Sequence, residues 1–266
     1  MKGDGAHRLA LIRSYALDWL SIIFLLVTAL LLTTQVPTLI RPFRLDDPSI
    51  AAPWNQSETV PTWLLGVLSI LVPFMLQTLV ALGVRRDLHD WHHATLGLSL
   101  SLVLTLLITF LTKNMIGELR PSFLARCQPS SDIAIRKASL TVLGGVHWYT
   151  EAVCTGDPAA ILEGRKSFFS GHTSLSFAGL AFFAFYLGGK LHVFDRTGRV
   201  ARFVLALWPL VLALFIGLSR LHDQWHFWQD VLVGMLVGIG TARLAYRLYY
   251  PPLHDPLCDE PYRDRL

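Results

Sequence analysis

The sequence predicts an all-α, polytopic membrane protein with six transmembrane helices in a single membrane-embedded domain over residues 1–266. The chain is 53% hydrophobic and only 16% charged, whereas a soluble domain carries about 25% charged residues. Its charges are bunched, and the apolar stretches between them approach the roughly 20 residues that cross a bilayer. Six such stretches argue against a soluble core, and they cover about 14–34, 62–83, 94–112, 172–189, 203–219 and 227–249.

The first stretch follows Lys2, Arg8 and Arg13, and no small-residue cleavage pattern comes after it, so we expect a retained helix and not a signal peptide. With a cytoplasmic N-terminus, thirteen of the 23 Lys and Arg residues fall in short cytoplasmic segments. Seven of the others fall in the long segment 113–171. Because short loops decide orientation, the positive-inside rule places both termini in the cytoplasm. These flanking charges explain the net charge of +4, and nothing indicates a nucleic-acid partner.

Two further features fit this orientation. Asn55 opens the glycosylation sequon Asn55-Gln56-Ser57 in the first outside loop. Cys127 and Cys154 both lie in the long outside segment, where a disulfide is permitted, so we expect them to pair, with two free thiols as the alternative. The Pro-rich polar tail over about 251–266 is expected to be disordered.

A first cluster of candidate site residues closes the third stretch. Lys113 and Arg120 are seven residues apart, which on a helix returns them to nearly the same face. Pro121 then discourages further helix. Two cations on one face at a membrane boundary suit a phosphate, although a pair of interfacial snorkelling side chains is the alternative.

A second cluster opens the fourth stretch. Ser170 and Gly171 stand where a helix N-cap is expected, and His172 follows directly. The free N–H groups at such a helix start bind anions, and His172 would stand beside the anion as a proton donor. An ordinary Ser/Gly cap with an unrelated histidine is the alternative.

A third cluster lies between the last two stretches. His226 and Asp230 are four residues apart, which on a helix lets the carboxylate accept a hydrogen bond from the imidazole and fix its tautomer. Arg220, just upstream, carries a guanidinium that suits a phosphate. Taken alone, a His/Asp pair at this spacing is common.

The alternation of six spans brings these clusters to one side of the membrane. The end of span three, the start of span four, the end of span five and the start of span six all share that side. Three cations, a helix start and two histidines describe attack on a phosphorus centre. Because three side-chain cations are present and no carboxylate cluster is apparent, we expect no metal.

Three segments together resemble the signature of the type 2 phosphatidic acid phosphatases, a superfamily that includes glucose-6-phosphatase and the vanadium haloperoxidases. The segments are Lys113-x6-Arg120-Pro121, Ser170-Gly171-His172 and Ser219-Arg220-x5-His226-x3-Asp230. One departure is Phe169, where the family often has proline. The sequence from Ser170 to Lys190 and the Asp46-Asp47-Pro48 loop look most like those of fungal and plant lipid phosphate phosphatases, including diacylglycerol pyrophosphate phosphatases.

The resemblance implies a haloperoxidase-like helical core, magnesium-independent activity without a cofactor, and a site that faces the lumen or the exterior. It makes His226 the nucleophile, His172 the acid and Asp230 the residue that orients His226. It places the remaining signature residues around the phosphate: Lys113, Arg120, Ser170, Gly171 and Arg220.

The implied partners are the bilayer and a lipid phosphate substrate: phosphatidate, diacylglycerol pyrophosphate or lysophosphatidate. An isoprenoid-pyrophosphate or sphingoid-phosphate phosphatase would have the same site, and an inactive lipid-phosphate binding protein would lack one of the histidines. Six spans argue against a vanadate-dependent peroxidase. The sequence leaves open whether the membrane is an endomembrane, the vacuole or the plasma membrane, and whether the protein forms oligomers.

Overall fold

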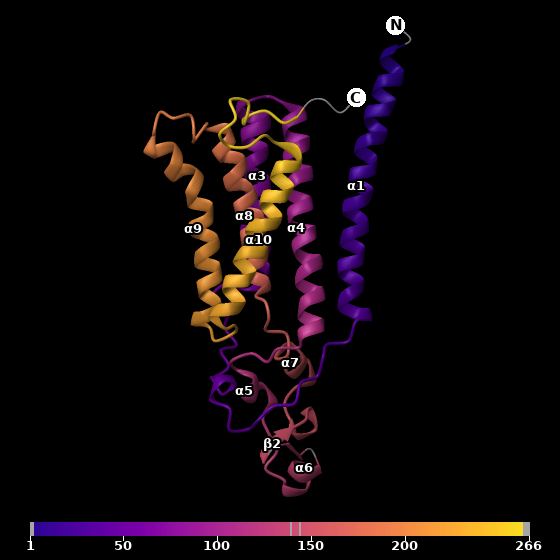
Figure 1. The fold of residues 1–266 in the computed structure, drawn as a ribbon, viewed down its shortest axis with the longest axis vertical. Coiled ribbons are helices and arrows are strands. Elements are labelled where there is room, and N and C mark those ends of the chain that lie inside the picture. Colours follow the sequence, from indigo (N-terminus) through magenta and orange to yellow (C-terminus); the bar gives the residue numbers. More distant parts are fainter. Residues whose placement is uncertain (1–2, 139, 144, 263–266) are drawn as a thin grey trace.

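The chain folds into a bundle of long helices with a smaller irregular region at one end, as the computed structural model shows (Figure 1). The structure describes residues 3–138, 140–143 and 145–262. Residues 62–84 run as one helix through successive α- and π-helical turns. The elements are α1 (Gly3–Gln35), η1 (Pro48–Ile50), α2 (Thr62–Gly66), η2 (Val67–Leu71), α3 (Val72–Thr78), η3 (Leu79–Val84), α4 (Leu88–Ile116), α5 (Phe123–Cys127), α6 (Ile133–Ala138), β1 (Leu140–Leu143), β2 (Val146–Tyr149), η4 (Glu151–Val153), α7 (Pro158–Glu163), α8 (Gly171–Lys190), α9 (Val200–His222) and α10 (Trp228–Tyr249).

Within the described residues, five helices are long and apolar enough to cross a membrane. They are Arg13–Gln35, Thr62–Val84, Leu88–Ile116, Val200–His222 and Trp228–Tyr249. Their outer faces carry large apolar side chains that are exposed in the isolated chain, including Phe24 and Phe215. Exposed apolar area of this extent is typical of a membrane-facing surface.

The expected span over 172–189 forms α8, but α8 is not among these five helices. Its first turn carries His172, Thr173 and Ser174, and it ends at Lys190. α8 packs against α4, α9 and α10, and 15 of its 20 residues are buried. A helix surrounded by protein can carry polar side chains and small residues that a lipid-facing helix would not.

Two glycines allow α10 to lie close against α8. A Cβ at Gly234 would come within 2.9 Å of the Ser170 carbonyl oxygen, and one at Gly238 within 2.5 Å of the Ser174 carbonyl oxygen. Small residues four apart permit this kind of backbone approach between membrane helices. The contact brings the start of α10 directly beside the start of α8.

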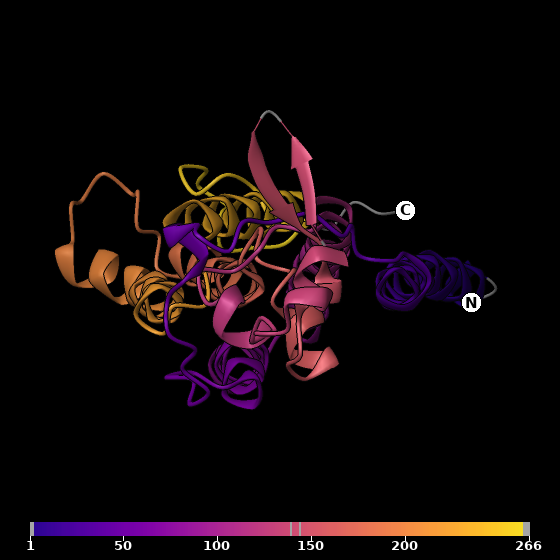
Figure 2. The same cartoon turned by 90° about the horizontal axis from the view of Figure 1, so that it is seen from below.

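The first helix stands at the side of the bundle, against α4 (Figures 1 and 2). In the N-terminal half of this helix, Trp19 Nε1 donates a hydrogen bond to His92 Nε2 at 3.1 Å. α4 begins at Leu88, six residues before the expected start of this span. His92 is therefore on a helix and not in a connecting loop.

The segment between α4 and α8 forms most of the irregular region, which includes a β1–β2 hairpin that projects from the molecule (Figure 2). Cys127, at the end of α5, is joined to Cys154 by a disulfide. Phe43, Phe123 and Val153 form a small core around this link. This core fixes the loop that leads into α8.

The expectation of a disordered tail over about 251–266 is wrong for residues 251–262. Cys258 is buried, and Tyr262 N donates to the Tyr249 carbonyl oxygen at 3.0 Å. Asp259 forms an ion pair with Arg85 at 2.6 Å and accepts, through its carbonyl oxygen, from Lys190 Nζ. These ties hold the tail against the helix ends. Residues 263–266, with Arg263 and Arg265, lie outside the described part of the chain, as does Lys2.

Candidate active site

The predicted site residues meet at the end of the bundle next to the irregular region. Lys113 is in the last turn of α4, Ser170 caps α8, Arg220 is in the last turn of α9, and Asp230 is in the first turn of α10. Ser170 N donates to the Asp230 carbonyl oxygen at 3.1 Å, which ties the starts of α8 and α10 together. The three sequence clusters therefore form one site.

His226 and Asp230 form the hydrogen-bonded pair that their spacing predicts. His226 Nδ1 lies 3.2 Å from Asp230 Oδ2, and both side chains are buried. The same oxygen accepts from Ser167 Oγ at 2.6 Å and from Phe227 N at 3.1 Å. A carboxylate can only accept, so Nδ1 carries the proton and Nε2 keeps its lone pair. The His226 ring is therefore oriented so that the lone pair of Nε2 is available for attack.

The charge state of His226 is set by its surroundings. Burial, followed by the positive charges of Arg120 and Lys113, holds the pKa of His226 well below its ordinary value. Both effects disfavour the protonated ring. His226 is therefore neutral at neutral pH, which is the form that can attack an electrophile.

The start of α8 has the arrangement expected of an anion site. Ser170 Oγ accepts from Thr173 N at 3.4 Å and from Thr173 Oγ1 at 2.9 Å, as an N-cap does. The first N–H groups of a helix have no acceptor within the helix, so they face outward with a partial positive charge. A Cβ at Gly171 would meet Lys113 Cε at 3.7 Å, so the helix start and the Lys113 side chain are adjacent.

Lys113 and Arg120 both point into the site, but the backbone between them differs from the predicted continuous helix. α4 ends at Ile116, and Gly117 closes it in the left-handed conformation with φ of 61°. Arg120 thus follows a turn and does not share a helical face with Lys113. The two side chains still converge, because Lys113 Nζ and Arg120 Nη2 both contact the Lys166 carbonyl oxygen. Arg120 also pairs with Glu163.

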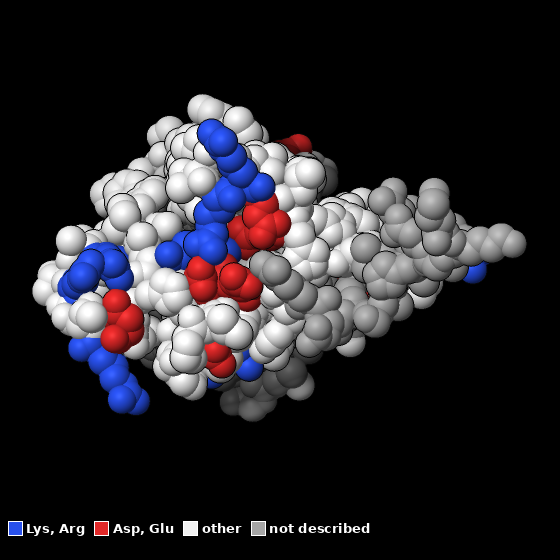
Figure 3. All heavy atoms as spheres, turned by 90° about the horizontal axis from the view of Figure 1, so that it is seen from above, with Lys and Arg blue, Asp and Glu red and all other residues white. Residues whose placement is uncertain are grey.

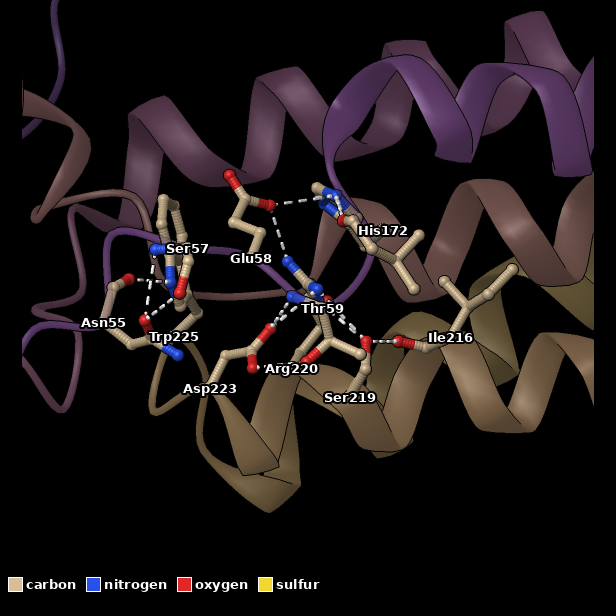
Figure 4. A network of polar contacts seen from close by, with 12 residues as sticks. Asn55, Ser57, Glu58, Thr59, His172, Ile216, Ser219, Arg220, Asp223 and Trp225 are labelled. Atoms are coloured by element: carbon tan, nitrogen blue, oxygen red, sulfur yellow. Dashed lines mark hydrogen bonds and ion pairs between the residues drawn. The ribbon is translucent and has the colours of Figure 1, made fainter.

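Arg220 is fully buried between two carboxylates that the sequence did not reveal (Figure 4). Its Nη1 lies 2.7 Å from Glu58 Oε2, and its Nη2 lies 3.0 Å from Asp223 Oδ2. Asp223 also accepts from Thr59 N at 2.8 Å. Asp223, which lies outside the predicted His226–Asp230 pair, is a buried counter-ion that holds Arg220 in place.

His172 points into the same network (Figure 4). Its Nε2 lies 3.1 Å from the Val60 carbonyl oxygen and 3.4 Å from Glu58 Oε2. Glu58 and Val60, which approach His172, thus come from the loop after α1, at positions that no predicted site motif included. A carboxylate in a polar loop has no periodicity that would single it out.

A stack of aromatic rings and guanidinium groups forms the outer wall of the site. The Trp225 ring centroid lies 4.7 Å from Arg120 Cζ and 4.4 Å from Arg126 Cζ, and Arg126 also lies over Trp54. Cation–π contacts of this kind stabilise a charge that is removed from water. Burial and the charge of Arg120 lower the pKa of Arg126 to about 10. Trp225 therefore connects a phosphate-binding candidate, Arg120, to the loop that carries His226.

The remaining predicted residues lie outside this cluster. Asn55 is exposed, and its Oδ1 accepts from Ser57 Oγ at 2.9 Å, while its carbonyl oxygen accepts from Trp225 Nε1 at 3.0 Å. The Cys127–Cys154 link lies in the irregular region. Among the described residues, no group of three or more His, Cys, Asp or Glu side chains is placed to hold a metal ion.

Comparison with known proteins agrees with this geometry. The chain matches the PAP2 superfamily over residues 94–252. It is 37% identical to lipid phosphate phosphatase 2 of Arabidopsis thaliana over 253 residues, covering 94% of this chain and 82% of that protein. It is 34% identical to diacylglycerol pyrophosphate phosphatase 1 of Saccharomyces cerevisiae over 249 residues, covering 91% and 83%. No solved structure gives a significant match. The match over most of the domain, together with the assembled site, shows that this chain belongs to the PAP2 superfamily of lipid phosphate phosphatases.

Proposed function

We propose that this protein hydrolyses the terminal phosphate of membrane lipids through a covalent phosphohistidine. The substrates are phosphatidate, lysophosphatidate and diacylglycerol pyrophosphate, the last suggested by the yeast relative. The observation that carries the proposal is the buried His226–Asp230 pair within a ring of cations and beside the start of α8. This combination suits in-line attack on phosphorus.

In the first step, His226 Nε2 attacks phosphorus and the bond from phosphorus to the leaving oxygen breaks. Asp230 holds the Nδ1 proton and stabilises the positive charge that the ring acquires. His172 donates a proton to the leaving oxygen, so diacylglycerol departs from phosphatidate, and phosphatidate departs from the pyrophosphate. A protonated His172 is required for this step.

In the second step, water attacks the phosphohistidine. His172, now neutral, accepts a proton from the water, and the bond between phosphorus and His226 Nε2 breaks. Inorganic phosphate leaves, and His226 and His172 return to their starting states. One histidine thus acts as acid and then as base, as microscopic reversibility requires.

The cations and the helix start stabilise the charge on the transferred phosphoryl group. Lys113 approaches from α4, Arg120 from the turn after it and Arg220 from α9, and the first N–H groups of α8 approach beside them. Donors that are fixed before reaction require no reorganisation during it. Ser170 and Gly171 shape the helix start and do not take part in proton transfer.

We further propose that α8 is the sixth membrane span and that the site faces the lumen or the exterior. With α8 included, successive helices alternate in direction, which places both ends of the described chain on the side opposite the site (Figure 1). Basic side chains lie on that opposite end of the molecule, with acidic side chains beside them (Figure 3). Arg85, Lys190 and Arg202 belong to this end, which supports a cytoplasmic location by the positive-inside rule.

The test uses the purified full chain in detergent with EDTA present. We expect phosphate release from phosphatidate, lysophosphatidate or diacylglycerol pyrophosphate, and loss of release in His226→Ala. Asp195→Asn, which removes an ion pair with Arg202 at the end of the molecule opposite the site, is the matched control and should retain activity. Absence of release from every lipid phosphate, or an unchanged rate in His226→Ala, would contradict the proposal.

A further inference from the structure

The loop after α1 lies across the site and touches it repeatedly. We call residues 54–60 the strap. Trp54 stacks on Arg126, Thr59 donates to Asp223 from both N and Oγ1, and the Val60 carbonyl oxygen contacts His172. The strap is therefore anchored on both sides of Glu58, the one residue of it that places a carboxylate in the site (Figure 4).

The Glu58 carboxylate contacts two of the groups that the proposed reaction assigns to the phosphate, Arg220 and His172. Glu58 Oε2 lies 2.7 Å from Arg220 Nη1 and 3.4 Å from His172 Nε2. A phosphate with one oxygen bound to Arg220 and its leaving oxygen beside His172 would need the same space. A carboxylate oxygen and a phosphate oxygen are both anionic acceptors of similar size, so each can take the place of the other.

The charges around the site favour replacement of the Glu58 carboxylate by the phosphate and not simultaneous binding of both to Arg220. Arg120 is paired with Glu163, and Arg220 is paired with both Glu58 and Asp223. A phosphomonoester adds about 1.5 to 2 negative charges near neutral pH. Two anions cannot share the Arg220 Nη1 position, since like charges at this distance repel strongly.

Of the two carboxylates on Arg220, Glu58 is the one free to move. The Asp223 side chain is fully buried and holds two hydrogen bonds from Thr59, whereas the Glu58 side chain is 19% exposed. Glu58 can turn outward by side-chain rotation while Thr59 and Val60 keep the strap in place. Asp223 would then keep Arg220 oriented for the incoming phosphate.

We propose that Glu58 is an internal counter-ion that occupies the phosphate position in the empty site and is displaced when phosphate binds. This inference rests on the proposed function and adds a residue that sets its substrate affinity. Occupation by Glu58 keeps Arg220 and His172 in place between turnovers and reduces the apparent affinity for every phosphate ligand. If Glu58 occupies the position in roughly nine molecules of ten, the apparent affinity falls about tenfold.

The test compares Glu58→Gln and Glu58→Ala with the wild-type full chain in detergent. Glu151→Gln is the matched control, because Glu151 pairs with Arg165 outside the site. The inhibition constants of inorganic phosphate and orthovanadate are measured at one fixed pH, together with KM and kcat for phosphatidate. We expect both Glu58 variants to lower the inhibition constants and KM by about three- to tenfold, and Glu151→Gln to leave them unchanged.

Two results would overturn the inference. One is inhibition constants that are unchanged or higher in the Glu58 variants. The other is a fall in kcat with unchanged KM, which would make Glu58 a partner that keeps His172 protonated. Melting curves in detergent confirm that the variants are folded, and Glu58→Gln preserves the side-chain size if Glu58→Ala unfolds. A wild-type protein that is neither active nor inhibited by phosphate would instead refute the proposed function.

Discussion

Asp230→Asn isolates the electrostatic contribution of the carboxylate behind His226. Asp230 Oδ2 accepts from His226 Nδ1, Ser167 Oγ and Phe227 N, whereas Oδ1 is buried without a hydrogen-bond partner among the described residues. An asparagine can place its oxygen at the Oδ2 position and its amide nitrogen at the Oδ1 position. The three hydrogen bonds and the tautomer of His226 then survive, and only the negative charge is lost.

The expected loss follows from the separation of the two groups. When Nε2 bonds to phosphorus, the ring becomes cationic at 3.2 Å from Oδ2. The Coulomb attraction at this distance is about 5 kcal/mol with an effective dielectric constant near 20, and a hydrogen bond to a charged group contributes about 1.5–3 kcal/mol. Since a neutral hydrogen bond is retained, we expect a loss of about 3 kcal/mol, which lowers kcat roughly 150-fold.

The assay measures steady-state phosphate release from phosphatidate by purified wild type and Asp230→Asn. Ser167→Ala is the comparison variant, because it removes the 2.6 Å hydrogen bond to the same oxygen and keeps the charge. Its expected loss is about 1 kcal/mol, or roughly fivefold in kcat. A loss under tenfold in Asp230→Asn, or an equal loss in both folded variants, would refute the electrostatic role of Asp230.

Three further predictions address other parts of the site. Asp223→Ala leaves the buried Arg220 without its inner counter-ion and should destabilise the protein by about 3–5 kcal/mol; an unchanged unfolding temperature in detergent would contradict the buried pair. Trp225→Ala should raise KM for phosphatidate about tenfold, because the cation–π contact with Arg120 is lost. Trp225→Phe keeps an aromatic face and should have a KM close to that of the wild type. An equal rise of KM in both variants would instead point to the hydrogen bond from Trp225 Nε1. Because the pKa of His226 is lowered in the folded state, the unfolded chain binds more protons below about pH 6.5, so stability falls with falling pH. His226→Gln should flatten this fall in the melting temperature, and an identical slope would show that His226 is not buried in its neutral form.

The residues that we propose to carry the reaction could be predicted from the sequence because they lie at or next to helix ends. The spacing of His226 and Asp230 predicted their hydrogen bond, and Ser170 caps α8 as its position suggested. The bounds of four predicted spans lie within three residues of the candidate spans, whereas the third begins six residues earlier than expected. α8 lies at the centre of the bundle, and its polar first turn explains why it differs from the lipid-facing helices.

The residues that support the site could not be predicted in the same way. Glu58 and Ser167 come from loops, where no periodic pattern relates sequence spacing to direction. Asp223 stands one residue past the end of α9, and only the turn back toward Arg220 shows its role. The tail was also missed, because its Pro-rich composition indicated disorder, whereas Asp259 holds it through an ion pair with Arg85 and a hydrogen bond from Lys190.

The central claim is that His226 becomes phosphorylated, and chemical trapping of that intermediate tests it most directly. Phosphatidate labelled in its phosphate is mixed with excess purified enzyme, turnover is stopped with alkali within the first cycle, and the labelled peptide is identified. The account predicts an alkali-stable, acid-labile phosphate on the peptide that contains His226, with no label in His226→Ala. Label on His172, or continued turnover by His226→Ala, would contradict it.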